Sequence, residues 1–344
     1  MPTSVTYWTH TWDPSKEAIS KEIVALRQGG REKAPVVAFS PGHRTRFDHR
    51  GRVLLLSSRR WLALRAVGAI VEPLGQVTHI FGGPESWHLF RSLGRRPILL
   101  TVVASRLGAV QLPMTNLVRV AVEVESSIDD WIGAGIPRAR IEIVRPGVDL
   151  EWFAATSAPA ASARFTLLFA STPSDPAELD ARGIPVLVEL ARALPDVDIV
   201  VPWRAWGDVD AARKALEDLR PPANFVLTFG DVKDMRIQYA RAHATIACFE
   251  VGAAKSCPNF VVEGLACARP CIATPGVGIA ALLERTGAGL IASRDVASLA
   301  DAVNRLRVAW MVYAERARRL AEEEFDVRHF VARYERLYDE VAAR

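Results

Sequence analysis

The chain has 344 residues, of which 50% are hydrophobic and 24% are charged, and its formal net charge is +4. This length suits two domains of ordinary size, and the composition is that of a soluble globular protein. No apolar run reaches the roughly 18 residues that a membrane-spanning helix needs. Residues 1–15 lack the basic end and apolar run of a secretory signal, so we expect a cytoplasmic protein.

The first half of the chain alternates strand-like and helix-like segments, a pattern typical of parallel sheets. Strands are expected at residues 4–8, 35–40, 77–81, 98–103, 118–124 and 141–144. Helices are expected at residues 16–27, 57–71 and 128–134. An Ala-, Ser- and Pro-rich stretch at about 151–163 then indicates a linker.

The second half resumes the same alternation. Strands are expected at residues 165–170, 198–201, 225–229, 244–248 and 270–273. Helices are expected at residues 185–194, 233–241, 258–268 and 296–319, with a last amphipathic helix at about 326–342. The pattern predicts an α/β protein of two domains, residues 1–150 and 151–325.

Four cysteines lie close together in the second half, at Cys248, Cys257, Cys267 and Cys271. They form no CxxC pair, and no histidine lies at ligand spacing from them. We therefore expect small buried thiols rather than a zinc site.

The stretch from Lys255 to Glu263 is the most informative one for chemistry. A loop leads into a helix that begins at Pro258, a residue suited to a first helical turn. The free N–H groups and the positive end of the helix dipole favour an anion there. Glu263 follows one to two turns later and can reach hydroxyl groups beside that anion. Together they suit a phosphorylated ribose; the alternative is a surface helix with an unrelated glutamate.

In this stretch the chain resembles the retaining, metal-independent glycosyltransferases of the GT-B fold, family four. Their hallmark is two glutamates eight residues apart, and PNFVVEGLACARPCIAT stands in that register. The resemblance implies that Glu263 binds the donor ribose, and that the backbone amides of Asn259 and Phe260, after Pro258, face the sugar and diphosphate. Lys255 stands where the family has its first glutamate, which contacts the donor sugar.

Further segments fit the same family. Residues 141–149 (IEIVRPGVD), which include Arg145, resemble the junction that enters the cleft between the two domains. Gly230 and Val232 lie in a segment similar to the loop near the nucleotide base. The family's arginine after the first strand of the second domain is replaced by Ser-Thr-Pro, and Arg182-Gly183 matches its Lys-Gly pair. Arg182 is therefore expected to bind the diphosphate; the alternative is a solvated loop arginine.

Two features of the first half bear on the acceptor. His79 resembles a residue at the cleft-facing end of a family strand, which makes it a candidate catalytic or acceptor-binding group; a core histidine is the alternative. A basic segment also runs from residue 44 to residue 65, with one acid, Asp48. Its seven arginines are Arg44, Arg46, Arg50, Arg52, Arg59, Arg60 and Arg65. With the apolar face of the predicted helix 57–71 they suit an anionic membrane surface; the alternative is a helix that covers the sheet.

The resemblance implies a GT-B protein of two Rossmann-like domains that face each other across a cleft, with the helix at 326–344 crossing back to the first domain. It implies transfer of a sugar from a nucleotide-sugar donor to a glycan, a lipid-linked acceptor or a small molecule, with retention and with neither metal nor other cofactor. Peripheral contact with the inner face of the membrane is compatible with it. A nucleotide-sugar epimerase and a non-catalytic GT-B-like binding partner are the alternatives, and nucleic acid is not expected.

Overall fold

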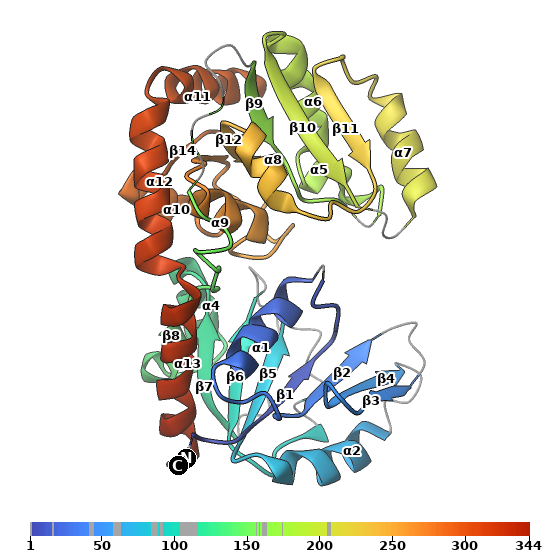
Figure 1. The fold of residues 1–344 in the computed structure, drawn as a ribbon, viewed down its shortest axis with the longest axis vertical. Coiled ribbons are helices and arrows are strands. Elements are labelled where there is room, and N and C mark those ends of the chain that lie inside the picture. Colours follow the sequence, from blue (N-terminus) through green and yellow to red (C-terminus); the bar gives the residue numbers. More distant parts are fainter. Residues whose placement is uncertain are drawn as a thin grey trace. The chain divides into compact units, whose positions relative to one another are not determined.

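The computed structural model describes residues 2–15, 17–40, 45–57, 63–83, 89, 92–103, 116–155, 157, 159, 164–173, 175–204 and 208–344. The chain forms two compact bodies, each built on its own sheet (Figure 1). The first body comprises residues 1–147 and 327–344, and the second comprises residues 148–326. The first body is therefore made from both ends of the chain.

The first body has a sheet whose strand order in the described chain is β3-β4-β2-β1-β5-β6-β7-β8. All neighbours pair in parallel except β3 and β4, which are antiparallel. The strands are β1 Val5–Thr9, β2 Val36–Ser40, β3 Arg46–Asp48, β4 Val53–Ser57, β5 Val77–Gly82, β6 Ile98–Val102, β7 Leu117–Val122 and β8 Ile141–Ile143.

Helices cover both faces of this sheet. They are α1 Ala18–Gln28, α2 Ala63–Val71, η2 Glu72–Leu74, η4 Glu125–Ser127, α4 Ile128–Gly133, η5 Arg138–Arg140 and α13 Val327–Ala342. On one face α1 and the C-terminal helix α13 pack over Tyr7 and Phe81. On the other face Leu64 of α2 and Trp131 of α4 join Trp8 in a second core. Alternate residues of each buried strand thus serve two cores.

The second body has a parallel sheet in the order β11-β10-β9-β12-β13-β14. Its strands are β9 Phe165–Leu168, β10 Val197–Trp203, β11 Phe225–Phe229, β12 Ala244–Ala247, β13 Cys271–Ala273 and β14 Gly289–Ile291. Its helices are α5 Glu178–Ala181, α6 Ile184–Ala193, α7 Val209–Asp218, α8 Met235–Arg241, α9 Asn259–Ala266, α10 Ala280–Thr286, α11 Val296–Val308 and α12 Trp310–Glu324.

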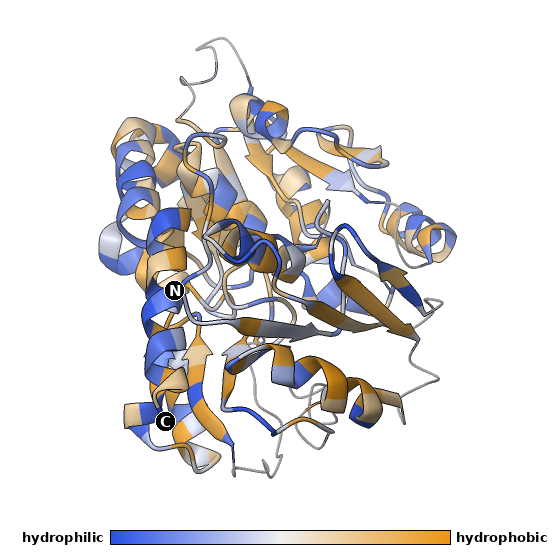
Figure 2. Ribbon diagram, turned by 60° about the horizontal axis from the view of Figure 1, so that its bottom comes forward, coloured by the Kyte–Doolittle hydropathy of each residue, from blue (hydrophilic) through white to orange (hydrophobic). Residues whose placement is uncertain are grey.

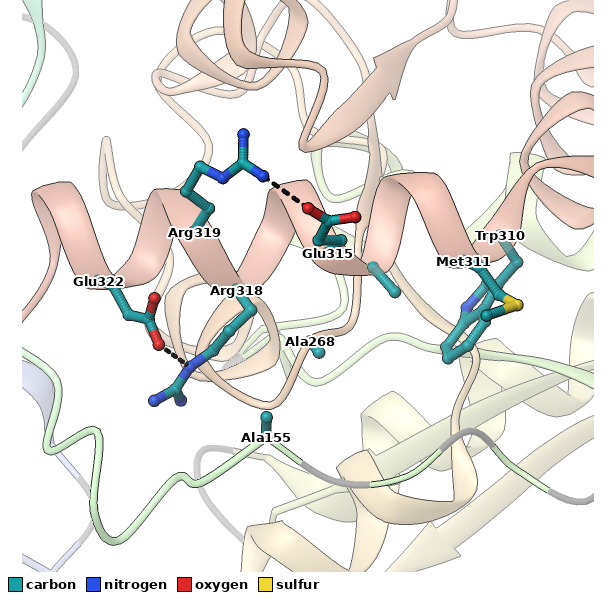
Figure 3. Close-up of a pocket in the computed structure, with 9 residues that line it drawn as sticks. Ala155, Ala268, Trp310, Met311, Glu315, Arg318, Arg319 and Glu322 are labelled. Atoms are coloured by element: carbon teal, nitrogen blue, oxygen red, sulfur yellow. Dashed lines mark hydrogen bonds and ion pairs between the residues drawn. The ribbon is translucent and has the colours of Figure 1, made fainter.

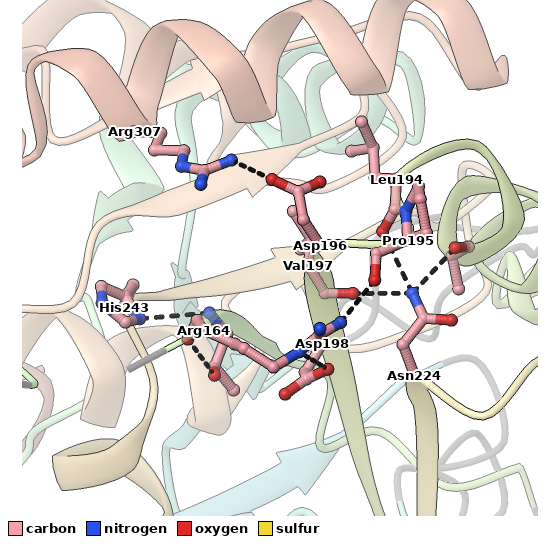
Figure 4. Close-up of polar contacts among 11 residues, drawn as sticks. Arg164, Leu194, Pro195, Asp196, Val197, Asp198, Asn224, His243 and Arg307 are labelled. Carbon is pink, nitrogen blue, oxygen red and sulfur yellow. Dashed lines mark hydrogen bonds and ion pairs between the residues drawn. The ribbon is translucent and has the colours of Figure 1, made fainter. Parts of the chain in front are cut away.

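Polar contacts join the chain at the amino ends of three of these strands (Figure 4). The Asn224 side-chain amide donates to the carbonyl oxygens of Ala191, Leu194 and Val197 at 2.8, 3.1 and 2.7 Å. Arg164 and Asp198 form an ion pair at 2.8 Å. These contacts fix where β9, β10 and β11 begin, and they leave ligand chemistry to the opposite, carboxyl edge.

Several elements differ from the sequence-based expectation. In the segment predicted as one helix at 57–71, Ser57 is the last residue of β4 and α2 occupies Ala63–Val71; residues 58–62 lie outside the described residues. The helix predicted at 296–319 is two helices, because the backbone leaves the helical region at Ala309 (φ −113°). The elements β3, β4, α5, α7, α10 and β14 were not predicted. In the described part of the chain, no helix is long and apolar enough to cross a membrane.

The four cysteines are buried and free, as expected. Cys248 follows β12 and Cys271 begins β13, and burial raises the pKa of the Cys271 thiol to about 12. They act as small core side chains.

Candidate functional site

The start of α9 lies at the carboxyl edge of the second sheet, after the loop that follows β12. Pro258 is its N-cap residue, with extended backbone (φ −63°, ψ 127°) and no side-chain hydrogen bond to the first turn. Two polar atoms beside this turn, Ser256 Oγ and Asn259 Oδ1, are buried and have no hydrogen-bond partner in the described structure. Unpaired N–H groups with unpaired side-chain oxygens form a polar site that a ligand with both anionic and hydroxyl groups would satisfy.

Glu263 lies one turn into α9 and is 8% exposed. Its Oε2 accepts a hydrogen bond of 2.9 Å from the hydroxyl of Tyr239 on α8. Burial first, and then the Glu263 carboxylate, raise the pKa of Tyr239 well above its usual value, so that the hydroxyl keeps its proton. The pair therefore holds a carboxylate in a fixed orientation beside the helix start.

Arg182 is held at the same edge of the sheet. Its Nη1 donates to Ser171 Oγ, after β9, at 2.7 Å, and its Nε donates to Glu178 at 2.9 Å. The side chain is 16% exposed, which is not the solvated loop arginine of the alternative interpretation. The next residue, Gly183, has φ +78°, and a Cβ there would lie 2.4 Å from the carbonyl oxygen of Cys248. This close approach fixes Arg182 near the ends of β9 and β12.

A second arginine, Arg204, joins this edge and was missed in the sequence. It follows β10 directly, and its backbone N–H donates to Thr172 Oγ1, after β9, at 3.1 Å. Its charge opposes the rise in the Tyr239 pKa, which places the guanidinium within electrostatic reach of the Tyr239–Glu263 pair. A cation immediately after a buried strand would have indicated Arg204 in the sequence. It was missed because the strand was predicted to end at residue 201, whereas β10 ends at Trp203.

Arg294 links two of the segments that carry these groups. Its guanidinium pairs with Glu250 at 2.9 Å and with Asp180 at 3.1 Å, and its Nε donates to the Cys248 carbonyl at 3.3 Å. It thereby ties the end of α5, which leads into Arg182, to the segment that follows β12.

The other predicted donor residues lie in two further loops of the second body and in the first body. Gly230 (φ +122°) and Val232 are half-buried in the loop after β11, the edge strand of the sheet. Lys255 is half-buried in the loop before α9. Arg145 belongs to the first body, where it is 4% exposed and pairs with Glu125 at 2.7 Å. This contact gives Arg145 a structural role in holding the turn at η4.

His79 is the core histidine of the alternative interpretation. It is the third residue of β5 rather than its last, and it is 0% exposed. Its Nδ1 forms a hydrogen bond of 2.8 Å with the Tyr338 hydroxyl, and its Nε2 forms one of 2.7 Å with Thr101 Oγ1. Burial lowers its pKa well below the usual value, so the ring is neutral. Because both ring nitrogens are engaged inside the core, the structure does not support a catalytic role for His79.

A cavity of about 570 Å³ in the second body lies apart from this site (Figure 3). Trp310, Met311 and Arg318 of α12 line it, together with Ala268 just beyond the C-terminal end of α9. Ion pairs join Glu315 with Arg319 and Arg318 with Glu322 along its wall, as Figure 3 shows. The cavity is therefore at the opposite end of α9 from Pro258, and it is not part of the candidate site.

Comparisons with known proteins bear on the fold that carries this site. Residues 165–307 match the model of the family described as glycosyl transferases group 1. Among solved structures, HepE of Anabaena in complex with UDP is 14% identical, with a TM-score of 0.74 over 98% of this chain and 100% of that one. Sucrose-phosphate synthase from Thermosynechococcus elongatus is 15% identical, with a TM-score of 0.74 over 99% of both chains. No curated protein sequence matches the chain significantly. These likenesses confirm the predicted GT-B fold.

Proposed function

We propose that this protein transfers a sugar from a nucleoside diphosphate sugar to an acceptor hydroxyl, with retention and without a metal ion, because residues 165–307 match the model of the glycosyl transferases group 1 family. The observation that carries this proposal is the buried carboxylate of Glu263, held by Tyr239 beside the first turn of α9. A carboxylate next to an anion-binding helix start matches a ribose next to a diphosphate.

In this proposal the donor diphosphate lies against the first turn of α9. Arg182 and Arg204, at the carboxyl ends of the neighbouring strands, supply the positive charge that a metal ion supplies elsewhere. The bond between the anomeric carbon and the β-phosphate oxygen breaks, the acceptor oxygen bonds to the same face of that carbon, and the proton of the acceptor hydroxyl passes to the leaving diphosphate. Negative charge grows on the leaving diphosphate, where preorganised donors and cations stabilise the transition state.

The identity of the nucleotide is a further part of the proposal. HepE of Anabaena was solved with UDP, with UDP and glucose, and with UDP-glucose. UDP and UDP-glucose are therefore the first probes for this protein. The acceptor is a glycan, a lipid-linked sugar or a small molecule.

The test compares the parent protein with Glu263→Gln, which keeps the shape of the side chain and removes its charge. Loss of a charge-assisted hydrogen bond is expected to raise the UDP dissociation constant in calorimetry by roughly ten- to a hundredfold, about 1.5–3 kcal/mol. The control Glu315→Gln, on α12, is expected to leave UDP binding unchanged. Transfer from UDP-glucose is expected to persist in EDTA.

Equal UDP affinity in Glu263→Gln and the parent contradicts the ribose assignment. Activity that vanishes in EDTA and returns with manganese contradicts the metal-free mechanism. Tight donor binding with neither transfer nor donor hydrolysis identifies a non-catalytic binding partner instead.

A further inference from the structure

A second cavity, of about 780 Å³, opens in the first body at the amino ends of β1 and β2. Thr3 and Ser4 before β1, and Ala34 and Pro35 before β2, form one side of it. Apolar side chains form much of the rest: Phe47 of β3, Leu54 of β4, Val71 of α2 and Leu74 of η2. Parallel α/β sheets bind their substrates at the carboxyl ends of strands, so this cavity is at the edge that substrate chemistry does not use.

Two apolar side chains of the cavity lining, Phe47 and Leu74, are exposed, as is Ile70 next to the lining residue Val71. Ile70 is 71% exposed, Leu74 is 64% exposed and Phe47 is 48% exposed. The outer side of a surface helix is normally polar, but Arg65 is the only charged residue of α2. In Figure 2, α2 is accordingly coloured mostly as hydrophobic. A contiguous exposed apolar surface of this kind indicates a contact with another apolar phase or molecule.

Hydrogen bonds of a buried glutamate hold the backbone that carries this apolar surface. Glu72, at the junction of α2 and η2, is 0% exposed. Its carboxylate accepts hydrogen bonds from the Thr78 hydroxyl at 2.9 Å and from the backbone N–H of Gly94 at 3.0 Å. The residues on either side of Glu72 are thereby anchored to β5 and to the chain before β6. These hydrogen bonds fix the backbone from which the exposed side chains of Ile70 and Leu74 extend.

Cations surround the same surface. Four of them are exposed on the segments that border it: Lys33 before β2, Arg50 and Arg52 of the β3–β4 hairpin, and Arg65 of α2. The acids on these segments are Glu32 and Asp48. His49 packs edge-on against Phe47, with ring centroids 4.5 Å apart, which holds the aromatic ring at the rim. Apolar side chains within a basic rim complement an anionic lipid surface.

We propose that this face of the first body docks the protein onto an anionic lipid bilayer. Ile70, Leu74 and Phe47 enter the boundary between headgroups and acyl chains. The four cations of the rim then meet the lipid phosphates, with the carboxyl ends of the strands at the opposite edge of the sheet. This contact lies closer to the β3–β4 hairpin and η2 than the contact expected from the sequence. Arg44, Arg59 and Arg60 lie outside the described residues.

The proposal is tested by co-sedimentation with vesicles of phosphatidylcholine alone and of phosphatidylcholine mixed equally with phosphatidylglycerol. The parent is expected to bind the anionic vesicles and to be released by high salt. Ile70→Ser/Leu74→Ser is expected to weaken binding at least tenfold, since both side chains leave the apolar phase. Lys33→Gln/Arg50→Gln is expected to weaken it about 25-fold, or fivefold for each basic residue.

The matched control is Val308→Ser/Met311→Ser in the second body, where the two side chains are 89% and 78% exposed. This variant is expected to bind vesicles as the parent does, and all variants are expected to bind UDP equally. Unchanged vesicle binding by both test variants overturns the proposal. So does equal binding of the parent to neutral vesicles. A dimer that Ile70→Ser/Leu74→Ser dissociates in sedimentation equilibrium, without vesicle binding, assigns the surface to a second copy of the chain.

Discussion

A chain of buried hydroxyl groups surrounds the imidazole of His79 in the first body. Tyr338 contacts one ring nitrogen and Thr101 the other, and Thr101 Oγ1 is in turn 2.6 Å from the Tyr334 hydroxyl. A neutral imidazole has one donor and one acceptor nitrogen, so it matches hydroxyl groups that can both donate and accept. A protonated ring would bring an unpaired charge into the core.

The predicted consequence is a loss of stability in acid. Burial lowers the pKa of His79 in the folded state. Below about pH 6.5 this imidazole therefore binds a proton in the unfolded chain but stays neutral in the folded chain. The stability is full above that pH and falls below it by up to about 1.4 kcal/mol per pH unit. Melting temperatures at pH 7 and pH 5 are expected to differ less in His79→Gln than in the parent. Burial also lowers the His243 pKa, so part of the slope remains. An unchanged slope in His79→Gln, matching that of the exposed control His49→Gln, contradicts this account.

At the residue scale, the sequence indicated the groups that one segment carries together. Pro258, Asn259 and Glu263 occur within a single loop and helix, so their proximity follows from helical geometry alone. The partner of Glu263 comes from α8, 24 residues away in the chain. The contact between Arg294 and Asp180 spans 114 residues. Such contacts depend on strand order, which local patterns do not encode.

Among the secondary-structure elements, long apolar runs were predictable and short or charged ones were not. The buried strands of the second sheet read as continuous apolar stretches, which parallel strands require. The strand β14 has three residues and the helix α5 four, too few for a period to show. The strands β3 and β4 lie in the arginine-rich segment, where charge obscured the strand Val53–Ser57.

The turn between α5 and α6 offers a test at the scale of an element. Gly183 combines a left-handed φ of +78° with a would-be Cβ 2.5 Å from the Cβ of Cys248. Gly183→Ala is expected to cost more than the ~1–3 kcal/mol of backbone strain alone, since the turn must also move away from β12. UDP affinity is expected to fall, because Arg182 moves with the turn. Gly135→Ala, at φ +91° with open space around it, is the control for strain. An equal loss of stability in both variants, with unchanged UDP binding, contradicts this role of the turn.

At the scale of the whole molecule, the two bodies have separate cores that respond to different substitutions. Leu337 of α13 packs in the core of the first body, and Leu306 of α11 is buried in the second. Leu337→Ala is expected to cost about 2–5 kcal/mol and to speed hydrogen exchange in β1, β5 and β6. Exchange in β9 and β10, and UDP affinity, are expected to stay unchanged. Leu306→Ala is expected to give the reverse pattern. Faster exchange throughout the chain in both variants contradicts independent cores.

The first body is built from residues 1–147 and 327–344, which affects the order in which the two bodies fold during synthesis. Domains usually fold as they leave the ribosome, the N-terminal one first. Here the face of the first sheet that carries Tyr7 and Phe81 lacks part of its cover until α13 has emerged. The second body is complete by residue 326, before α13 is made, so we expect it to finish folding before the first body does. Until α13 is made, the nascent chain therefore exposes apolar side chains of the first sheet, and we expect chaperones to bind this half.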